Sequence, residues 1–269
     1  HYSSRRQRQM CIRDSSSAPH RESSPCSMSL ASCAASSNGA NRDAKRDRDR
    51  ARPRRSNKVK TRRVSQHTDV AFVEPTLSKP LSRPAPSCDA ASLPGLIVYD
   101  LDDTIWFPEL YMIAGAPFVK TSKSTVVDSG GARLGCYPAA LASVALAKSC
   151  GAFRERGTLI AVASRTHRGK WARELMDAFE VRDGDDDART LAACVDFVDI
   201  ASGSKTKHFA RLREKSGVPY AEMLFFDNER ENIDEVARLG VACVHCPGGL
   251  SADAWRRGLT FFVDDVVDP

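Results

Sequence analysis

The stretch LIVYDLDDT (Leu96–Thr104) joins an apolar run to three aspartates, Asp100, Asp102 and Asp103. A short apolar run of this kind predicts a buried β-strand, which here ends in a carboxylate. Carboxylates at such a position are poorly hydrated and repel one another strongly in a low dielectric. A hard divalent cation would relieve this repulsion, and Mg²⁺ prefers oxygen ligands. The alternative is an Asp-rich surface turn that begins a helix.

Downstream of this stretch, apolar runs alternate with segments that have a helical period. Strands that are apolar throughout and alternate with amphipathic helices indicate a parallel sheet covered on both faces. We therefore predict an α/β fold for residues 93–269, a Rossmann-like three-layer sandwich. The predicted strands are Leu96–Asp100, Leu159–Ser164, Cys194–Ile200, Met223–Asp227 and Val241–Cys246, and the predicted helices are Pro138–Lys148, His167–Phe179, Lys205–Ser216, Glu229–Leu239 and Ala252–Gly258.

Three of these strands end in a side chain suited to chemistry, namely Asp100, Ser164 and Asp227. Ligands of parallel sheets bind beyond the carboxyl ends of the strands, so these side chains are candidates for one shared site. Asp227 could add an oxygen ligand to the same cation, or it could cap the following helix. The Ser164 hydroxyl could hold a phosphate oxygen with backbone N–H groups of the next turn, or it could be a simple helix cap.

Lys205, in GSKTKHF, begins a predicted helix, where its charge is unfavourable with the helix dipole. The aspartate cluster could compensate for this charge, and the alternative is an exposed lysine. Arg165 and His208 also lie near the site by sequence. Arg165 could bind the phosphate or another anionic group of a substrate, or it could be a solvated arginine.

These motifs occur in a defined order: D-x-D-x-T, then Ser, then Lys, then Asp. The order resembles that of the haloacid dehalogenase superfamily. The strings DLDDTIW, ASRT, GSKTKHF and FFDNERENI are similar to the magnesium-dependent phosphatase family within it, and the likeness covers residues 95–262. The D-x-D-x-T motif alone is moderately specific, whereas four motifs in order on the expected elements are highly specific.

The resemblance implies a phosphatase of the same fold with Mg²⁺ as its cofactor. Asp100 would be the nucleophile that forms an aspartyl-phosphate, and Asp102 would be the general acid and base. The Asp100 side chain, the Asp102 main-chain carbonyl and Asp227 would hold the Mg²⁺ ion. Ser164 and Lys205 would bind the phosphoryl group. Phosphoryl transfer depends mainly on positioning and charge neutralisation, which fits these residue types.

The chain departs from the family pattern at two positions. Asp103 stands where some relatives carry an aromatic residue, and Asn228 stands where many carry a second acidic residue. Asn228 could still orient a metal-bound water, although the loss of one negative charge should weaken Mg²⁺ binding modestly. Glu229 and Asn232 are further candidates for contacts that support the metal ligands.

The segment FVKTSKSTVVDSGGARLG (118–135) predicts a short hairpin with a Gly-Gly turn. No insertion between the motifs is long enough for a large cap domain, so we expect a minimal hairpin cap and an open cleft. The resemblance implies protein-phosphotyrosine-like or fructosamine-phosphate substrates. A phosphatase of small metabolites is the alternative.

The N-terminal part differs from the rest in composition and charge. Residues 1–90 hold 19 Lys and Arg against 8 Asp and Glu, a net charge of +11, so the remainder carries −5 of the total of +6. Segment 1–92 is rich in Ser, Arg, Pro and Ala and has no sustained period, which predicts a disordered tail. The basic run Arg42–Arg63 could be a transit peptide, a nuclear signal, an anion-binding arm or a solvated linker.

The charge distribution also bears on partners. A basic chain ordinarily suggests nucleic acid, but the predicted domain is mildly acidic, so we do not expect it to bind nucleic acid. We expect a phosphorylated small molecule or phosphoprotein as its substrate. The rival hypothesis is a binding protein that works through Arg42–Arg63 and carries a vestigial phosphatase domain.

The sequence gives few signals for location. It contains no apolar run of 18 or more residues that would span a membrane and no signal-peptide core. Nine cysteines at irregular spacing favour reduced thiols, and the pair Cys243 and Cys246 lacks the partners of a zinc site. We expect a cytoplasmic monomer, or an organellar protein if the tail is a transit peptide. The first 16 residues resemble translated adapter DNA, and we assign them no function.

Overall fold

The computed structural model of the protein describes residue 72 and residues 76–182 and 188–268. At its centre lies a five-stranded parallel sheet with the order β10-β7-β2-β11-β12. The chain starts this sheet in the middle, adds two strands on one side, and then crosses to the other. This reversal places a ligand-binding crevice at the carboxyl ends of the central strands. The strands are β2 (Leu96–Tyr99), β7 (Leu159–Ser164), β10 (Phe197–Ile200), β11 (Met223–Asp227) and β12 (Ala242–His245).

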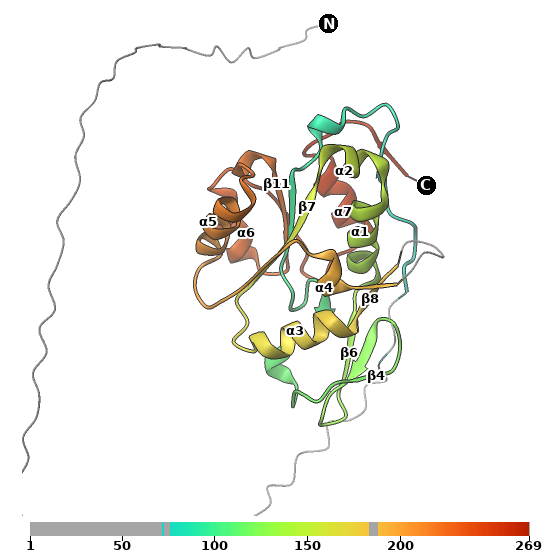
Figure 1. Cartoon of the computed structure of the whole chain (residues 1–269), viewed down its shortest axis with the longest axis vertical. Helices are drawn as coiled ribbons and strands as arrows, with labels where there is room; N and C mark the ends of the chain where they lie inside the picture. The colour runs from blue at the N-terminus through green and yellow to red at the C-terminus, as the bar shows by residue number, and fades with distance from the viewer. Residues whose placement is uncertain (1–71, 73–75, 183–187, 269) are drawn as a thin grey trace, which may run out of the picture. The chain divides into compact units, whose positions relative to one another are not determined.

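Helices cover both faces of the sheet, with α5 and α6 on one face and α1, α2 and α7 on the other (Figure 1). The predicted α/β three-layer sandwich is therefore confirmed. Within the described residues, no helix combines the length and the apolarity needed to cross a bilayer. The helices are α1 (Pro138–Ser149), α2 (Gly151–Arg156), α3 (Gly169–Ala178), α4 (Leu191–Cys194), α5 (Lys205–Ser216), α6 (Arg230–Ala237) and α7 (Ala252–Leu259), with short 3-10 helices η1 (Ala90–Ser92), η2 (Leu110–Met112) and η3 (Tyr220–Glu222).

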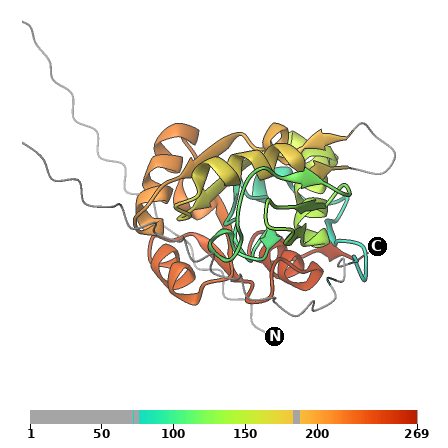
Figure 2. The ribbon, with the colours of Figure 1, turned by 90° about the horizontal axis from the view of Figure 1, so that it is seen from below.

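A small antiparallel sheet with the order β3-β6-β5-β4 follows the carboxyl end of β2 and forms the predicted hairpin cap. Figures 1 and 2 show it at the same end of the central sheet as α3, and the rings of Phe118 and Trp171 join the two. The Gly-Gly turn is held by Asp128, whose carboxylate accepts from the N–H groups of Gly130 and Ala132. The cap strands are β3 (Trp106–Phe107), β4 (Val119–Lys120), β5 (Thr125–Val127) and β6 (Arg133–Cys136).

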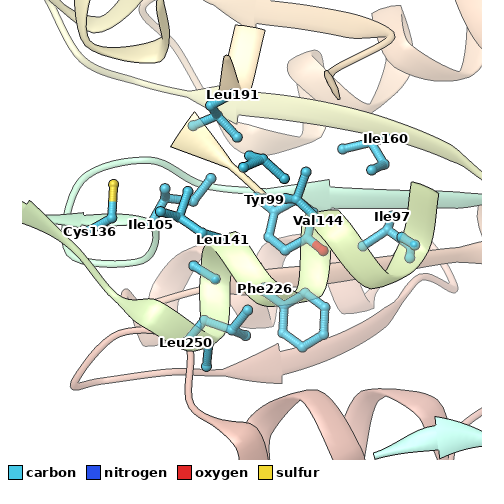
Figure 3. Packing of buried hydrophobic residues seen from close by; sticks show 14 of the residues in the cluster. Ile97, Tyr99, Ile105, Cys136, Leu141, Val144, Ile160, Leu191, Phe226 and Leu250 are labelled. Atoms are coloured by element: carbon cyan, nitrogen blue, oxygen red, sulfur yellow. The ribbon is translucent and has the colours of Figure 1, made fainter. Parts of the chain in front are cut away.

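The core is divided by the central sheet, because neighbouring residues of a strand point to opposite faces. On β2, Leu96 and Val98 pack with the residues of α5 and α6. Ile97 and Tyr99 pack on the other face, where Figure 3 shows them beside Val144 of α1. Apolar side chains cover both faces of the sheet, so its buried polar side chains lie at the ends of the strands.

Several predicted boundaries differ from the structure by one to three residues, and two of them are instructive. The strand predicted over Cys194–Ile200 begins only at Phe197, because Cys194 ends α4, whose first turn is capped by the Thr190 hydroxyl. The helix predicted from His167 begins at Gly169, so that His167 and Arg168 lie in the loop after β7. Both errors arise where short turns held by side-chain hydrogen bonds replace regular structure.

Residues 81–92 belong to the packed structure, although the sequence predicts them to be part of the tail. Strand β1 (Arg83–Pro84) pairs with β13 (Val266–Val267) near the other end of the chain. The Ser82 carbonyl accepts from Trp255 Nε1 at 2.9 Å, and Leu81 is buried. Residues 1–71, with the basic run inside them, and residues 73–75 lie outside the described residues. A last short pair, β8 (Glu180–Val181) with β9 (Arg189–Thr190), flanks the gap at 183–187.

Candidate active site

Asp100, Ser164 and Asp227 lie together at the ends of three adjacent strands. Asp100 directly follows β2, while Ser164 and Asp227 are the last residues of β7 and β11. Strand β2 pairs with both neighbours, so its end lies between theirs. All three side chains are buried. The structure therefore brings these predicted site residues to one edge of the sheet, where the apolar core ends.

Lys205, the first residue of α5, reaches into this group. Its Nζ lies 2.5 Å from Asp100 Oδ1 and 2.9 Å from Asp227 Oδ2, and it also donates to the Ala163 carbonyl at 2.6 Å. The side chain is only 1% exposed. Burial lowers the pKa of a lysine, but the two carboxylates more than offset this effect, and the pKa of Lys205 is raised. The alternative of an exposed lysine is therefore wrong.

Two buried carboxylates share this one ammonium, which leaves the group with excess negative charge. Burial raises the pKa of Asp100, while the charge of Lys205 acts against this effect. One cation already contacts both carboxylates, so their oxygens lie within reach of a second small cation at the same edge. Among the described residues no three His, Cys, Asp or Glu side chains make a complete metal site alone. Two carboxylates with a carbonyl and waters would suit Mg²⁺, which usually keeps several waters.

Asp102 lies on the turn after β2 and lines the cleft in front of these residues. Its Oδ1 accepts a hydrogen bond from Trp106 Nε1 at 2.8 Å. Burial raises the pKa of Asp102, and hydrogen bonds from Trp106, the Leu110 backbone and Thr166 oppose that rise. A carboxyl group with a raised pKa holds a proton more readily, which is the direction a general acid requires.

A set of contacts from the start of α6 fixes Asp227. Asn232 Nδ2 lies 3.1 Å and 3.0 Å from its two carboxylate oxygens, and the Glu229 N–H donates to Oδ1 at 2.7 Å. Arg165 in turn donates to Asn232 Oδ1 at 2.9 Å. Arg165 lines the cleft beside Ser164. Its guanidinium is bonded to Asn232, the residue that orients Asp227.

The two departures from the family pattern lie close to the first motif. Asn228 lines the cleft, and its N–H donates to the Thr104 hydroxyl at 3.0 Å. Asp103 has a positive φ of 52°, in the left-handed region that Asp tolerates better than most residues.

Ser164 does not cap α3, because that helix begins beyond it at Gly169.

Three residues singled out by sequence lie elsewhere. His208 is buried against Asp199, with Nδ1 3.0 Å from Oδ2, and does not line the cleft. Cys243 and Cys246 pack into the apolar clusters on opposite sides of the sheet, so they do not form a shared site.

An open cleft of about 530 Å³ lies in front of Asp100 and Asp102. Sequence reasoning missed several of its walls, because they come from irregular loops that show no strand or helix period. The walls of the cleft carry charges of both signs, with acidic groups from the cap side and basic groups from the loop after β7. The missed lining residues are Glu109, Tyr111, Thr166, His167, Arg168, Ser202 and Gly203.

Known proteins share these features. A profile for the family described as Acid Phosphatase matches residues 92–265. The chain is 34% identical over 179 residues to Magnesium-dependent phosphatase 1 of Homo sapiens, covering 66% of this chain and 93% of that protein. It is 32% identical over 154 residues to a HAD-like hydrolase superfamily protein, P8B7.31, of Schizosaccharomyces pombe, covering 55% of this chain and 83% of that protein.

A solved structure, the N-terminal part of BF1531 from Bacteroides fragilis with a phosphatase domain complexed with Mg, is 16% identical and covers 64% of this chain and 41% of that chain. Its TM-score to this chain is 0.40. The profile match and the two sequence relatives show that the chain belongs to the acid phosphatase family, a group of haloacid dehalogenase-type phosphatases.

Proposed function

We propose that this phosphatase hydrolyses phosphomonoesters in two steps through an aspartyl-phosphate on Asp100. The observation that carries the proposal is the contact of Lys205 with both Asp100 and Asp227, at adjacent strand ends that face an open cleft. This arrangement places a nucleophilic oxygen, a positive charge and two candidate metal ligands within a few ångströms. Phosphoryl transfer needs such positioning and charge neutralisation more than any other contribution.

In the first step, an Asp100 carboxylate oxygen attacks phosphorus, and the bond from phosphorus to the ester oxygen breaks. Asp102 gives its proton to that oxygen, so the alcohol leaves neutral. In the second step, Asp102 takes a proton from water while the water oxygen attacks phosphorus. Phosphate leaves, and the Asp100 carboxylate is regenerated. Ser164 and Lys205 bind the phosphoryl oxygens throughout, with Arg165 at the edge of the cleft.

The cofactor is Mg²⁺, and Asp100, the Asp102 main-chain carbonyl and Asp227 would hold it. When bound, it supplies positive charge that offsets the phosphoryl oxygens. Asn232 and the Glu229 N–H keep the Asp227 carboxylate in place. Asn228 lies on the same side of the cleft and would contact a metal-bound water.

The purified chain should hydrolyse p-nitrophenyl phosphate only when Mg²⁺ is present. Two buried carboxylates against one ammonium leave the site short of positive charge for an incoming dianion. Release of p-nitrophenol should fall to background with excess chelator and return when Mg²⁺ is added back. Equal rates with and without the chelator would exclude the metal-dependent route.

Vanadate and beryllium fluoride should both inhibit strongly. Beryllium fluoride on a carboxylate mimics a phosphoryl group, and vanadate mimics the transferring group, so both should bind at Asp100. Inhibition curves against p-nitrophenyl phosphate, with sulfate as the control anion, would measure this effect. Full activity at saturating concentrations of both inhibitors would count against an aspartyl-phosphate.

For the substrate class, we propose a phosphotyrosine-type or fructosamine-phosphate group carried on protein. The small hairpin cap leaves the cleft open, and the exposed ring of Tyr111 lies at its wall. A large macromolecular substrate needs an open cleft to reach the site, whereas a small metabolite does not. Rates on phosphotyrosine peptides, fructosamine phosphates and free sugar phosphates would separate these classes. A preference for a free metabolite would overturn the assignment.

A further inference from the structure

We propose that Trp106 is a positioning residue for the reaction, because its indole N–H fixes the carboxyl group of Asp102. The proposal rests on the proposed function, in which Asp102 gives and takes the proton. Trp106 does not touch the phosphoryl group in this scheme. Its effect should appear only in the steps that use Asp102.

The turn after β2 places the indole of Trp106 against Asp102. The Asp103 N–H donates to the Trp106 carbonyl at 2.8 Å, and the Trp106 N–H donates to the Leu101 carbonyl at 3.2 Å. These bonds close a tight loop, so residues 102 and 106 face each other, with Trp106 Nε1 2.8 Å from Asp102 Oδ1. The side chains of Asp102 and Trp106 are therefore in direct contact.

The donor is rigid. Trp106 has no exposed surface, and its ring packs on Phe179 with the centroids 6.0 Å apart. Its strand is paired with β6 through Cys136. An indole N–H can only donate, and a buried one needs an acceptor. Asp102 is that acceptor, so packing of the whole ring sets the position of Oδ1.

This contact holds a side chain that the first motif alone would leave free to rotate. Orientation of the reacting groups matters for proton transfer, and a misplacement of about 1 Å can cost about 100-fold in rate.

The leaving group provides the test, because an acidic phenol leaves without a proton whereas a weakly acidic one needs it. The Trp106→Phe variant loses the indole N–H together with some buried ring volume, and the loss of volume should affect both substrates equally. We expect it to lower kcat/KM for phenyl phosphate by about tenfold or more and for p-nitrophenyl phosphate by less than about threefold, a part of the usual general-acid effect.

Trp255→Phe is the matched control. Trp255 is also fully buried, and its Nε1 donates to the Ser82 carbonyl at 2.9 Å, far from the cleft. This variant should keep the ratio of the two kcat/KM values at the wild-type level. Thermal unfolding of both Trp variants would show whether each is folded. Equal losses on both substrates in Trp106→Phe would overturn the proposal.

The Asp102→Asn variant separates this inference from the proposed function. If Asp102→Asn changes the substrate ratio and Trp106→Phe adds nothing in that background, the effect of Trp106 passes through Asp102. If Asp102→Asn changes the ratio and Trp106→Phe alone does not, the positioning role is wrong while the proposed function stands. If Asp102→Asn leaves the ratio unchanged, the acid role of Asp102 fails, and the positioning role fails with it.

Discussion

Replacing Asp100 by Asn should lower turnover of p-nitrophenyl phosphate by about four to six orders of magnitude, the range seen when members of a catalytic triad are removed. An amide oxygen is a poor nucleophile toward phosphorus, so no covalent intermediate forms. The substitution keeps the shape of the side chain, and the amide oxygen can still accept from Lys205 Nζ. Steady-state release of p-nitrophenol at saturating Mg²⁺ measures the effect.

Asp199→Asn is the control for this prediction. Asp199 is as buried as Asp100 and lies on β10 of the central sheet, but its carboxylate contacts His208 and Arg211 outside the cleft. Its variant should keep turnover within a few-fold of wild type while losing stability, because it disturbs a buried ion pair. The Asp100 variant should keep a cooperative unfolding transition. Near-normal turnover in a folded Asp100→Asn protein would exclude Asp100 as the nucleophile.

The ends of the central strands could be predicted from the sequence because their signal is local. Each of Asp100, Ser164 and Asp227 stops an apolar run, and parallel strands present their carboxyl ends at one edge. Lys205 could be predicted for an electrostatic reason, since a lysine at the start of a helix needs a nearby anion. The strand pattern therefore predicts a shared site for the three strand-end residues, and the resemblance to the phosphatase family adds Lys205 to it.

The loops of the cleft could not be predicted in the same way. The helical period around His167 continues into α3, but the turn before Gly169 is set by the Thr166 hydroxyl and not by the period. The contact of Asp102 with Trp106 depends on a tight turn, whereas a spacing of four residues by itself suggests a helix face. Both features follow from tertiary hydrogen bonds that a linear pattern does not contain.

The start of the domain was missed for a related reason. Segment 81–92 has no period and few large apolar residues, so its composition alone predicts disorder. Its order comes from the pairing of β1 with β13 and from the indole of Trp255, almost the length of the domain away. Local propensity does not predict contacts between residues so far apart in the sequence.

Replacing Lys205 by Met should lower the free energy of unfolding in the absence of Mg²⁺ by about 3–5 kcal/mol, the usual cost of breaking a buried ion pair. Methionine is of similar length and fills the same space. Because methionine carries no charge, the carboxylates of Asp100 and Asp227 stay buried without their shared cation, and the Ala163 carbonyl loses a donor. Urea unfolding with excess chelator measures the change.

Lys148→Met is the matched control, because Lys148 pairs with Asp196 at 2.7 Å in a partly exposed position. The same substitution there should cost about 0–1 kcal/mol. Saturating Mg²⁺ should then raise the unfolding midpoint of Lys205→Met more than that of wild type, since the ion would meet two carboxylates whose charge nothing else offsets. Equal stability losses in the two variants, or no added response to Mg²⁺, would mean that Lys205 does not balance the charge of this site. The protein would then have to keep two carboxylates at the strand ends without an internal cation, which their burial makes costly.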